Sequence, residues 1–324
     1  MLPYFPIDGD EYTMTMNARA LTGDHLIEVD EHYREELALK ETILAGDKRY
    51  YYQASPGTEA LQWEALELLL PNMARHHPQH FAFEAAPGRW VWTNHLLGAE
   101  TTFAPGDPAG LPLSPLDWLG RQVQEDLLIL DGDVAAGTPL VAGHLCFAAG
   151  WCLDEKIGQS FLAIHGPVPL FAGRIGRSAD LLMQRLKPGH PTGRVGWSIT
   201  TDGALNHAPI SVEQWRDTRR GITIANAGER CFLRLERQTF SRLPRTHGIL
   251  FTIHTYRAPI AAVAGEPARA RRLAAALRTM PPAMREYKGL TGYVEPLIAY
   301  LEARGRDGKA AGAGALVGMA DRLE

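Results

Sequence analysis

Two neighbouring runs in the last third of the chain constrain the fold most. Residues 231–244 read CFLRLERQTFSRLP and residues 246–260 read THGILFTIHTYRAPI, and both alternate apolar with polar side chains. This period of two, with many β-branched and aromatic residues, is typical of strands, and the short gap predicts an antiparallel pair. In the first run Arg234, Glu236 and Gln238 share one face, so polar groups lie on a half-buried sheet.

These polar side chains have two interpretations. Guanidinium groups make bidentate bonds to carboxylates, so the arginines suit a cofactor's carboxylates or a neighbouring glutamate. A solvated sheet face with cross-strand ion pairs explains them equally well. The sequence leaves both interpretations open.

The rest of the chain predicts a mixed α+β fold. Residues 1–25 are expected to form an extended arm, and residues 98–113 a loop rich in Gly and Pro. The second helix is expected to begin after Thr58 and to end at Pro71. We expect one domain over residues 1–305 and a mobile tail over 306–324. Strands are predicted at 80–84, 90–93, 127–130, 138–148 and 194–200, and helices at 31–44, 59–70, 117–127, 175–186, 212–219 and 266–304.

Composition excludes several classes of function. A net charge of −4 and a pI near 6.3 argue against nucleic-acid binding, which needs a clustered cationic face. No apolar run approaches eighteen residues and the first residues lack a signal-peptide pattern, so no membrane contact and a cytoplasmic location are expected. Cys146, Cys152 and Cys231 are too few and too scattered for a disulfide framework.

One histidine is held in an unusually rigid context. His165 directly precedes Gly166-Pro167-Val168-Pro169 in the stretch 144–171, HLCFAAGWCLDEKIGQSFLAIHGPVPLF. Proline fixes φ, so this imidazole is expected at a helix end that cannot drift, as a metal ligand requires. No HExxH, phosphate-binding glycine loop, nucleophile elbow or zinc-type cysteine cluster accompanies it.

Three ordered motifs carry a resemblance to a known family. They are GWCLDEKIGQSFLAIHGPVPLF, then RVGWSI, then LRLERQTFSRLPRTHGILFTIHTY. Over most of its length the chain resembles the haem-dependent oxidative N-demethylase α subunits. The resemblance implies a PAS-like core, a five-stranded antiparallel sheet with helices on one side, that encloses haem b and carries additional N- and C-terminal helices.

The resemblance also implies the activity. A small secondary amine such as dimethylamine would be oxidised with dioxygen at the haem, to give formaldehyde and a shorter amine. The electrons would come from partner subunits that carry a flavin and an iron–sulfur cluster. Three scattered cysteines agree with this, because they cannot hold a four-cysteine cluster here.

Site residues follow from the matching motifs. His165 is the implied proximal haem ligand, and thiolate ligation by Cys146 or Cys152 is kept as an alternative. Glu236 and Arg237 are the implied catalytic pair. The implied cofactor contacts are Arg234, Arg242, Arg245 and Trp197, with Tyr256 and Thr252 as further candidates for the pocket wall.

Two positions depart from the family pattern. The pattern leads us to expect a proline where this chain has Ala148 and an asparagine where it has Gly196. The second departure removes a hydrogen-bonding group near the implied pocket, so the amine need not be dimethylamine. Two other functions also stay open, a haem-based gas or redox sensor without turnover and a haem-free binding subunit.

Overall fold

A large antiparallel sheet forms the centre of the computed structural model. The structure describes residues 2–107, 109–209 and 217–317, with side chains as far as residue 306. The spatial order of its seven strands is β1-β8-β9-β10-β6-β7-β2. The strands are β1 (Arg19–Ala20), β2 (Tyr52–Ala54), β6 (Asp126–Leu130), β7 (Leu140–His144), β8 (Thr192–Thr200), β9 (Phe232–Arg242) and β10 (Ile249–Pro259).

The predicted strand pair is confirmed and lies at the middle of this sheet. Strands β9 and β10 pair antiparallel over eleven residues each, with Arg237 opposite His254, and β8 pairs with the other side of β9. The five consecutive strands β6 to β10 are contiguous, and the first and last of them are neighbours. The two outermost strands, β1 and β2, have only two and three residues.

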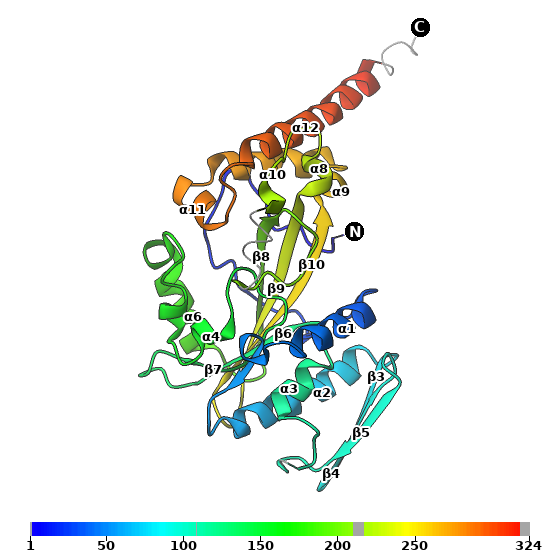
Figure 1. Ribbon diagram of the computed structural model, residues 1–324, viewed down its shortest axis with the longest axis vertical. Helices are drawn as coiled ribbons and strands as arrows, with labels where there is room; N and C mark the ends of the chain where they lie inside the picture. The colour runs from blue at the N-terminus through cyan, green and yellow to red at the C-terminus, as the bar shows by residue number, and fades with distance from the viewer. Residues whose placement is uncertain (1, 108, 210–216, 318–324) are drawn as a thin grey trace.

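Helices cover both faces of the sheet (Figure 1). The described helices are α1 (Tyr33–Leu44), α2 (Glu59–His76), α3 (Pro115–Gly120), α4 (Leu153–Lys156), α5 (Phe161–Ile164), α6 (Arg177–Arg185), α8 (Ala227–Arg230), α9 (Ile260–Val263), α10 (Pro267–Thr279), α11 (Pro282–Tyr287) and α12 (Val294–Val317). A mixed α+β fold is therefore confirmed.

The alternation along β9 decides which helices meet which face. The face that carries Glu236 and Phe240, here called the α6 face, packs through Phe240 and Ile249 against Phe161 of α5 and Met183 of α6. The opposite face, here called the α2 face, buries Leu250 against α2 and α3 and, further along the strands, Leu233 and Leu235 against α10 and α12. The sheet thus separates two apolar layers.

Three predicted boundaries were wrong. Helix α2 continues through Pro71 to His76, because buried Leu69, Leu70 and Met73 hold the turns around the proline against the core. The expected loop contains β5 (Ala99–Phe103), the third strand of a small sheet with β3 (Phe81–Ala86) and β4 (Arg89–Asn94). Helix α3 ends at Gly120, well short of the predicted helix end.

The C-terminal segment is helical further than predicted. Helix α12 continues to Val317 and projects away from the sheet (Figure 1). The predicted helix over 212–219 begins in residues 210–216, which lie outside the described part of the chain. Among the residues that are described, none of the helices is both long and apolar enough to cross a membrane.

Candidate functional site

His165 is fixed by its own helix. It follows α5, whose N-terminus is capped by Ser160, because the Ser160 Oγ accepts a hydrogen bond from the Ala163 amide at 3.3 Å. The His165 Nδ1 lies 2.8 Å from the Phe161 carbonyl oxygen. A carbonyl oxygen only accepts, so Nδ1 carries the proton and Nε2 keeps its lone pair. In the described chain, no hydrogen-bond partner occupies Nε2.

Aromatic rings and charge keep this imidazole neutral. Its ring lies nearly parallel to that of Phe171, with centroids 4.6 Å apart, and 4.7 Å from that of Phe161. Burial lowers the His165 pKa, and the positive charges of Arg194 and Lys156 lower it further. A neutral imidazole whose Nδ1 is held by a carbonyl group is the form that ligates a metal through Nε2.

Polar side chains from β8 and β9 lie on the same face of the sheet as α5. Arg194 is opposite Gln238, and Gly196 is opposite Glu236. The Glu236 carboxylate accepts hydrogen bonds from Arg234 Nε at 3.2 Å and from Gln238 Nε2 at 3.1 Å. On this face the Glu236 carboxylate is therefore already paired with Arg234, and Arg194 supplies a second guanidinium group nearby.

Arg194 is a partly buried cation with unused hydrogen-bonding capacity. Its Nη1 contacts only the Met16 Sδ, at 3.7 Å, and its Nε is buried without a hydrogen-bond partner. Burial lowers its pKa, and the Glu236 charge opposes that effect. An unpartnered buried donor is costly, so this position fits an anionic group, such as a ligand carboxylate.

Lys288 completes the cluster at the edge of β8. Its Nζ donates to the Trp197 carbonyl oxygen at 3.0 Å and lies 5.6 Å from the centroid of the indole ring. Burial lowers the Lys288 pKa to about 8, and the charge of Glu236 opposes this shift. We refer to His165, Arg194, Glu236, Gln238 and Lys288 as the β8–β9 site.

Gly196 leaves space in the β8–β9 site. A Cβ atom added to it would meet nothing closer than the Gln238 Nε2, at 3.9 Å. The free imidazole nitrogen of His165 and the unpartnered Nε of Arg194 lie on the same face of the sheet, and they are the donor types that bind a haem iron and a haem carboxylate. The donor atoms present therefore fit that cofactor.

The other arginines of the sequence-based site are used within the protein. Arg234 donates to Glu236, to the carbonyl oxygens of Leu205 and Phe147 and to Thr255. Arg242 donates to three carbonyl oxygens, those of Met183, Leu186 and His247. Arg245 is exposed and pairs with Glu67. Among the arginines of the β8–β9 region, Arg194 fits a cofactor better than Arg234 does.

Arg237 and the expected pocket-wall residues lie on the α2 face. Arg237 pairs with Glu28 at 3.2 Å and donates to the Leu26 and His25 carbonyl oxygens. Tyr256 donates to Glu28, and the hydroxyls of Thr252 and Thr239 are 2.7 Å apart. Trp197 is directed to this face as well, because its register partner is Leu235. The structure therefore does not bring Arg237 together with Glu236.

The three cysteines are poor candidates for the metal ligand, and His165 does not line either of the two cavities described here. Cys146, Cys152 and Cys231 are free and buried, and burial raises the pKa of each thiol, which disfavours a thiolate ligand. A cavity of about 330 Å³ lies between the N-terminal arm and β8, and Arg194 and Arg237 both line it.

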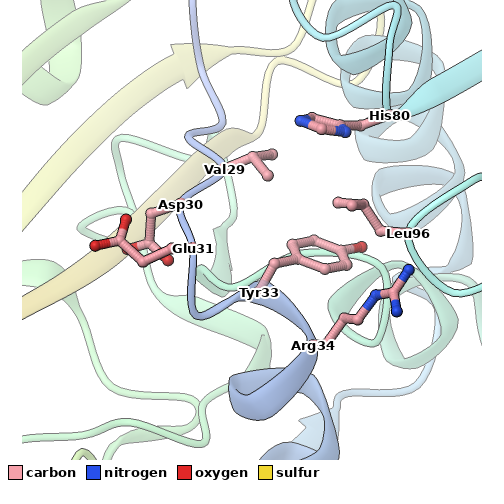
Figure 2. A pocket seen from close by; sticks show the side chains of 7 residues that line it. All are labelled: Val29, Asp30, Glu31, Tyr33, Arg34, His80 and Leu96. Atoms are coloured by element: carbon pink, nitrogen blue, oxygen red, sulfur yellow. The ribbon is translucent and has the colours of Figure 1, made fainter.

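A larger cavity, of about 470 Å³, opens beside α1 (Figure 2). Val29, Tyr33, His80 and Leu96 turn toward one another there, whereas Asp30 and Glu31 point away, as Figure 2 shows. Its centre is thus mostly apolar.

Fold and site together define an α+β protein with a single anchored imidazole beside a polar sheet face. Within the described ranges, no three or more His, Cys, Asp or Glu side chains are arranged to hold a metal ion. A family model described as haem-dependent oxidative N-demethylase, alpha subunit-like, matches residues 17–298. The chain belongs to this family, which confirms the resemblance and supports haem as the cofactor.

Sequence reasoning missed Arg194, Gln238 and Lys288 as a group. A signal existed for Arg194, because the period of two in RVGWSI places it two residues before Gly196 on the same face of the strand. No local pattern marks Lys288, which reaches the edge of β8 from the end of α11, 91 residues further along the chain than Trp197.

Proposed function

We propose that this chain is the haem b-binding catalytic subunit of an oxidative N-demethylase that acts on a small secondary amine, with dimethylamine as the first compound to test. One observation carries the proposal: the neutral, carbonyl-anchored imidazole of His165 and the Arg194 guanidinium, whose buried Nε lacks a hydrogen-bond partner, lie on the same face of the sheet in a chain of this family. The contiguous sheet of β6 to β10, with helices α4 to α6 on one face, supports a PAS-like haem-binding core.

Haem would supply the redox chemistry, the activation of dioxygen and the oxidation of an N-methyl group. His165 would hold the iron through Nε2, with its ring orientation set by Phe161 and Phe171. Arg194 would pair with a propionate, giving its Nε the partner that it lacks. Buried Cys146, Cys152 and Cys231 offer no covalent anchor, which is consistent with a b-type haem.

Glu236 would manage the proton of the amine. An amine donates electrons only when it is deprotonated, and a carboxylate beside it can accept that proton. Arg194, Arg234 and Lys288 lie close to Glu236, so the local field is positive and disfavours a bound alkylammonium ion. The β8–β9 site is therefore suited to hold the amine in its neutral, reactive form.

Electrons would be delivered by partner subunits that carry a flavin and an iron–sulfur cluster. The family description, which names an alpha subunit, supports a multi-subunit assembly. We propose dioxygen as the oxidant and a cytoplasmic location for this assembly.

The test starts with the absorption spectrum of the full chain produced with a haem precursor, for the wild type, His165→Ala and His190→Ala. We expect a Soret band in the wild type, a lost or shifted band in His165→Ala, and no change in His190→Ala, because His190 is exposed. Absence of haem from the wild type would overturn the proposal and favour a haem-free binding subunit.

Turnover separates the enzyme from a haem-based sensor. When a flavin and iron–sulfur reductase supplies electrons, adding dimethylamine should increase oxygen consumption. The amount of formaldehyde formed should equal the amount of dioxygen consumed in response to the amine. A protein that binds haem and oxygen but shows no amine-dependent consumption across a panel of secondary amines would be a sensor instead.

A further inference from the structure

Five of the twelve histidines gather far from α5, where the N-terminal arm crosses the end of α2. The His25 ring lies 4.9 Å from both the His76 ring and the His77 ring, and His77 lies 6.4 Å from His80. The His95 amide donates to the His80 carbonyl oxygen and so brings a fifth histidine to the same place. The proposed haem site uses none of them.

Two of these imidazoles direct the same nitrogen at each other. The Nε2 atoms of His25 and His77 are 2.9 Å apart, and the His77 Nε2 is also 2.9 Å from the Ile27 carbonyl oxygen. A single Nε2 proton on His77 would have to be shared between both contacts, because the carbonyl oxygen and the His25 lone pair only accept. The two Nε2 atoms and the Ile27 carbonyl oxygen are thus close together, and one proton serves all three.

The spacing of these atoms matches a metal coordination shell. Metal–imidazole bonds are about 2.1 Å long, so two ligands at right angles on one ion are separated by about 3.0 Å. The distance from the His77 Nε2 to the His25 Nε2 and the distance from the His77 Nε2 to the Ile27 carbonyl oxygen both have this value within about 0.1 Å. Imidazole nitrogen with additional oxygen ligands is the donor set of Zn²⁺, Ni²⁺ and Cu²⁺.

The neighbouring charges leave the two imidazoles available. Asp24 is occupied by Arg75 and by the His76 Nε2, so the adjacent carboxylate is already neutralised. Burial lowers the His25 pKa, and the charges of His77 and Arg237 lower it further, which keeps the His25 lone pair free near neutral pH.

We propose that His25 Nε2, His77 Nε2 and the Ile27 carbonyl oxygen bind one divalent late transition-metal ion, with water in the remaining positions. The His77 proton would move to Nδ1 as the ion replaces the shared hydrogen bond. Since His25 and Ile27 belong to the arm and His77 follows α2, the ion would join the arm to the helical layer.

The test is a calorimetric titration of Ni²⁺ into the full-length, chelator-treated protein with its haem content as isolated. We expect one site in the wild type, and at least tenfold weaker binding in both His25→Gln and His77→Gln. His190→Gln, at an exposed histidine outside the cluster, should bind like the wild type. Equal affinity and stoichiometry in all four proteins, or no binding to the wild type, would overturn the proposal.

A spectroscopic test has a wild-type measurement that does not depend on how well any variant folds. Bound to the wild type in equimolar amount, Cu²⁺ should show electron-paramagnetic-resonance splitting from two imidazole nitrogens, and from one nitrogen in His77→Gln. A Cu²⁺ spectrum of the wild type without two coupled imidazole nitrogens would refute the proposed ligand set. Because neither readout involves the Soret band, the result is independent of the haem proposal.

Discussion

A single unpartnered atom, the Nε, distinguishes Arg194 from Arg234 and Arg242 on the same face of the sheet. Arg234 and Arg242 direct their donors at carbonyl oxygens and at Glu236, so their role is complete within the protein. Arg194 keeps a buried Nε without a partner. Leaving such a donor unpaired costs about 1–3 kcal/mol, which a ligand carboxylate would recover.

Replacing Arg194 should therefore weaken the cofactor without changing its axial ligand. In Arg194→Gln we expect haem affinity to fall by about tenfold or more, the value of one charge-assisted hydrogen bond. The Soret position should stay that of the wild type, because His165 is unchanged. Haem transfer to apomyoglobin measures the affinity, and Arg245→Gln, at an exposed arginine, is the matched control. Wild-type haem affinity in Arg194→Gln would show that Arg194 does not contact the cofactor.

His254 is a buried cation held by two carboxylates. Its Nδ1 lies 2.9 Å from Glu125 Oε1, and its Nε2 lies 3.5 Å from Asp30 Oδ2. Burial alone would lower the His254 pKa, but Glu125 and Asp30 raise it to about 10. The folded protein therefore binds one more proton than the unfolded chain between the ordinary histidine pKa, about 6.5, and pH 10.

This difference predicts how stability depends on pH. The His254 contribution is complete below pH 6.5 and is lost as the pH rises through 10. We expect His254→Gln to be less stable than the wild type at pH 7 by about 3 kcal/mol, the usual cost of breaking a buried ion pair. The difference in the free energy of unfolding between the two proteins should decrease by up to about 1.4 kcal/mol per pH unit above neutrality. Urea unfolding of both proteins at pH 7, 8 and 9 measures this difference in the free energy of unfolding. A difference that stays constant with pH would mean that His254 is not charged.

At the scale of elements, helix α3 packs tightly against strand β7. A Cβ atom added to Gly120, the last residue of α3, would lie 2.2 Å from the ring of buried His144 on β7. Since the interior is close-packed, the helix or the ring would have to move.

Gly120→Ala is therefore expected to destabilise the protein by about 1–3 kcal/mol. The matched control is Gly173→Ala, because a Cβ atom at Gly173 meets nothing within 4 Å. That change should be neutral or slightly stabilising, since alanine favours helical backbone over glycine. Heat unfolding of the two variants measures the difference. Equal stability of both would show that the α3–β7 contact is looser than these distances indicate.

How far the sequence predicts an element depends on whether a local pattern carries it. Strands β9 and β10 are predictable because alternation over eleven residues has a single interpretation. Strand β5 is not, because AETTF between glycine and proline residues gains its strand structure from pairing with β4. Helix α2 passes Pro71 because core contacts outweigh one missing backbone hydrogen bond.

The site shows the same limit at longer range. His165 is predictable from the rigid GPVP sequence that follows it, and Glu236 from its place on a polar strand face. The family motif implies Glu236 and Arg237 as a catalytic pair, yet adjacent residues of a strand face opposite sides. The place of Lys288 depends on how α11 packs at the end of the sheet, which no local pattern encodes.

At the scale of the whole molecule, the first half of the C-terminal helix packs against the fold. Leu297, Ile298 and Leu301 of α12 are buried in the same cluster as Leu273 and Leu277 of α10. Figure 1 shows the remainder of α12 leaving the body of the molecule.

Removing the residues after Arg306 should therefore leave the thermal midpoint within about 2 °C of the full chain, because the buried α12 side chains described above all precede Arg306. A chain that ends before Val294 should lose cooperative unfolding, since the α10–α12 cluster is then opened to water. Circular dichroism during heating distinguishes the two truncations. A large loss of stability on removal of residues 307–324 would contradict our expectation of a mobile tail.

The two shortest strands have a consequence for solution behaviour. An exposed sheet edge offers unpaired amide and carbonyl groups on which another chain can add a strand. Here β1 and β2 close the large sheet with only two and three residues, while Lys288 binds the Trp197 carbonyl oxygen where β8 extends beyond β1. The long, apolar strands β9 and β10, which would aggregate most readily, have neighbours on both sides. The central position of these two long strands thus protects the chain from fibril-like assembly.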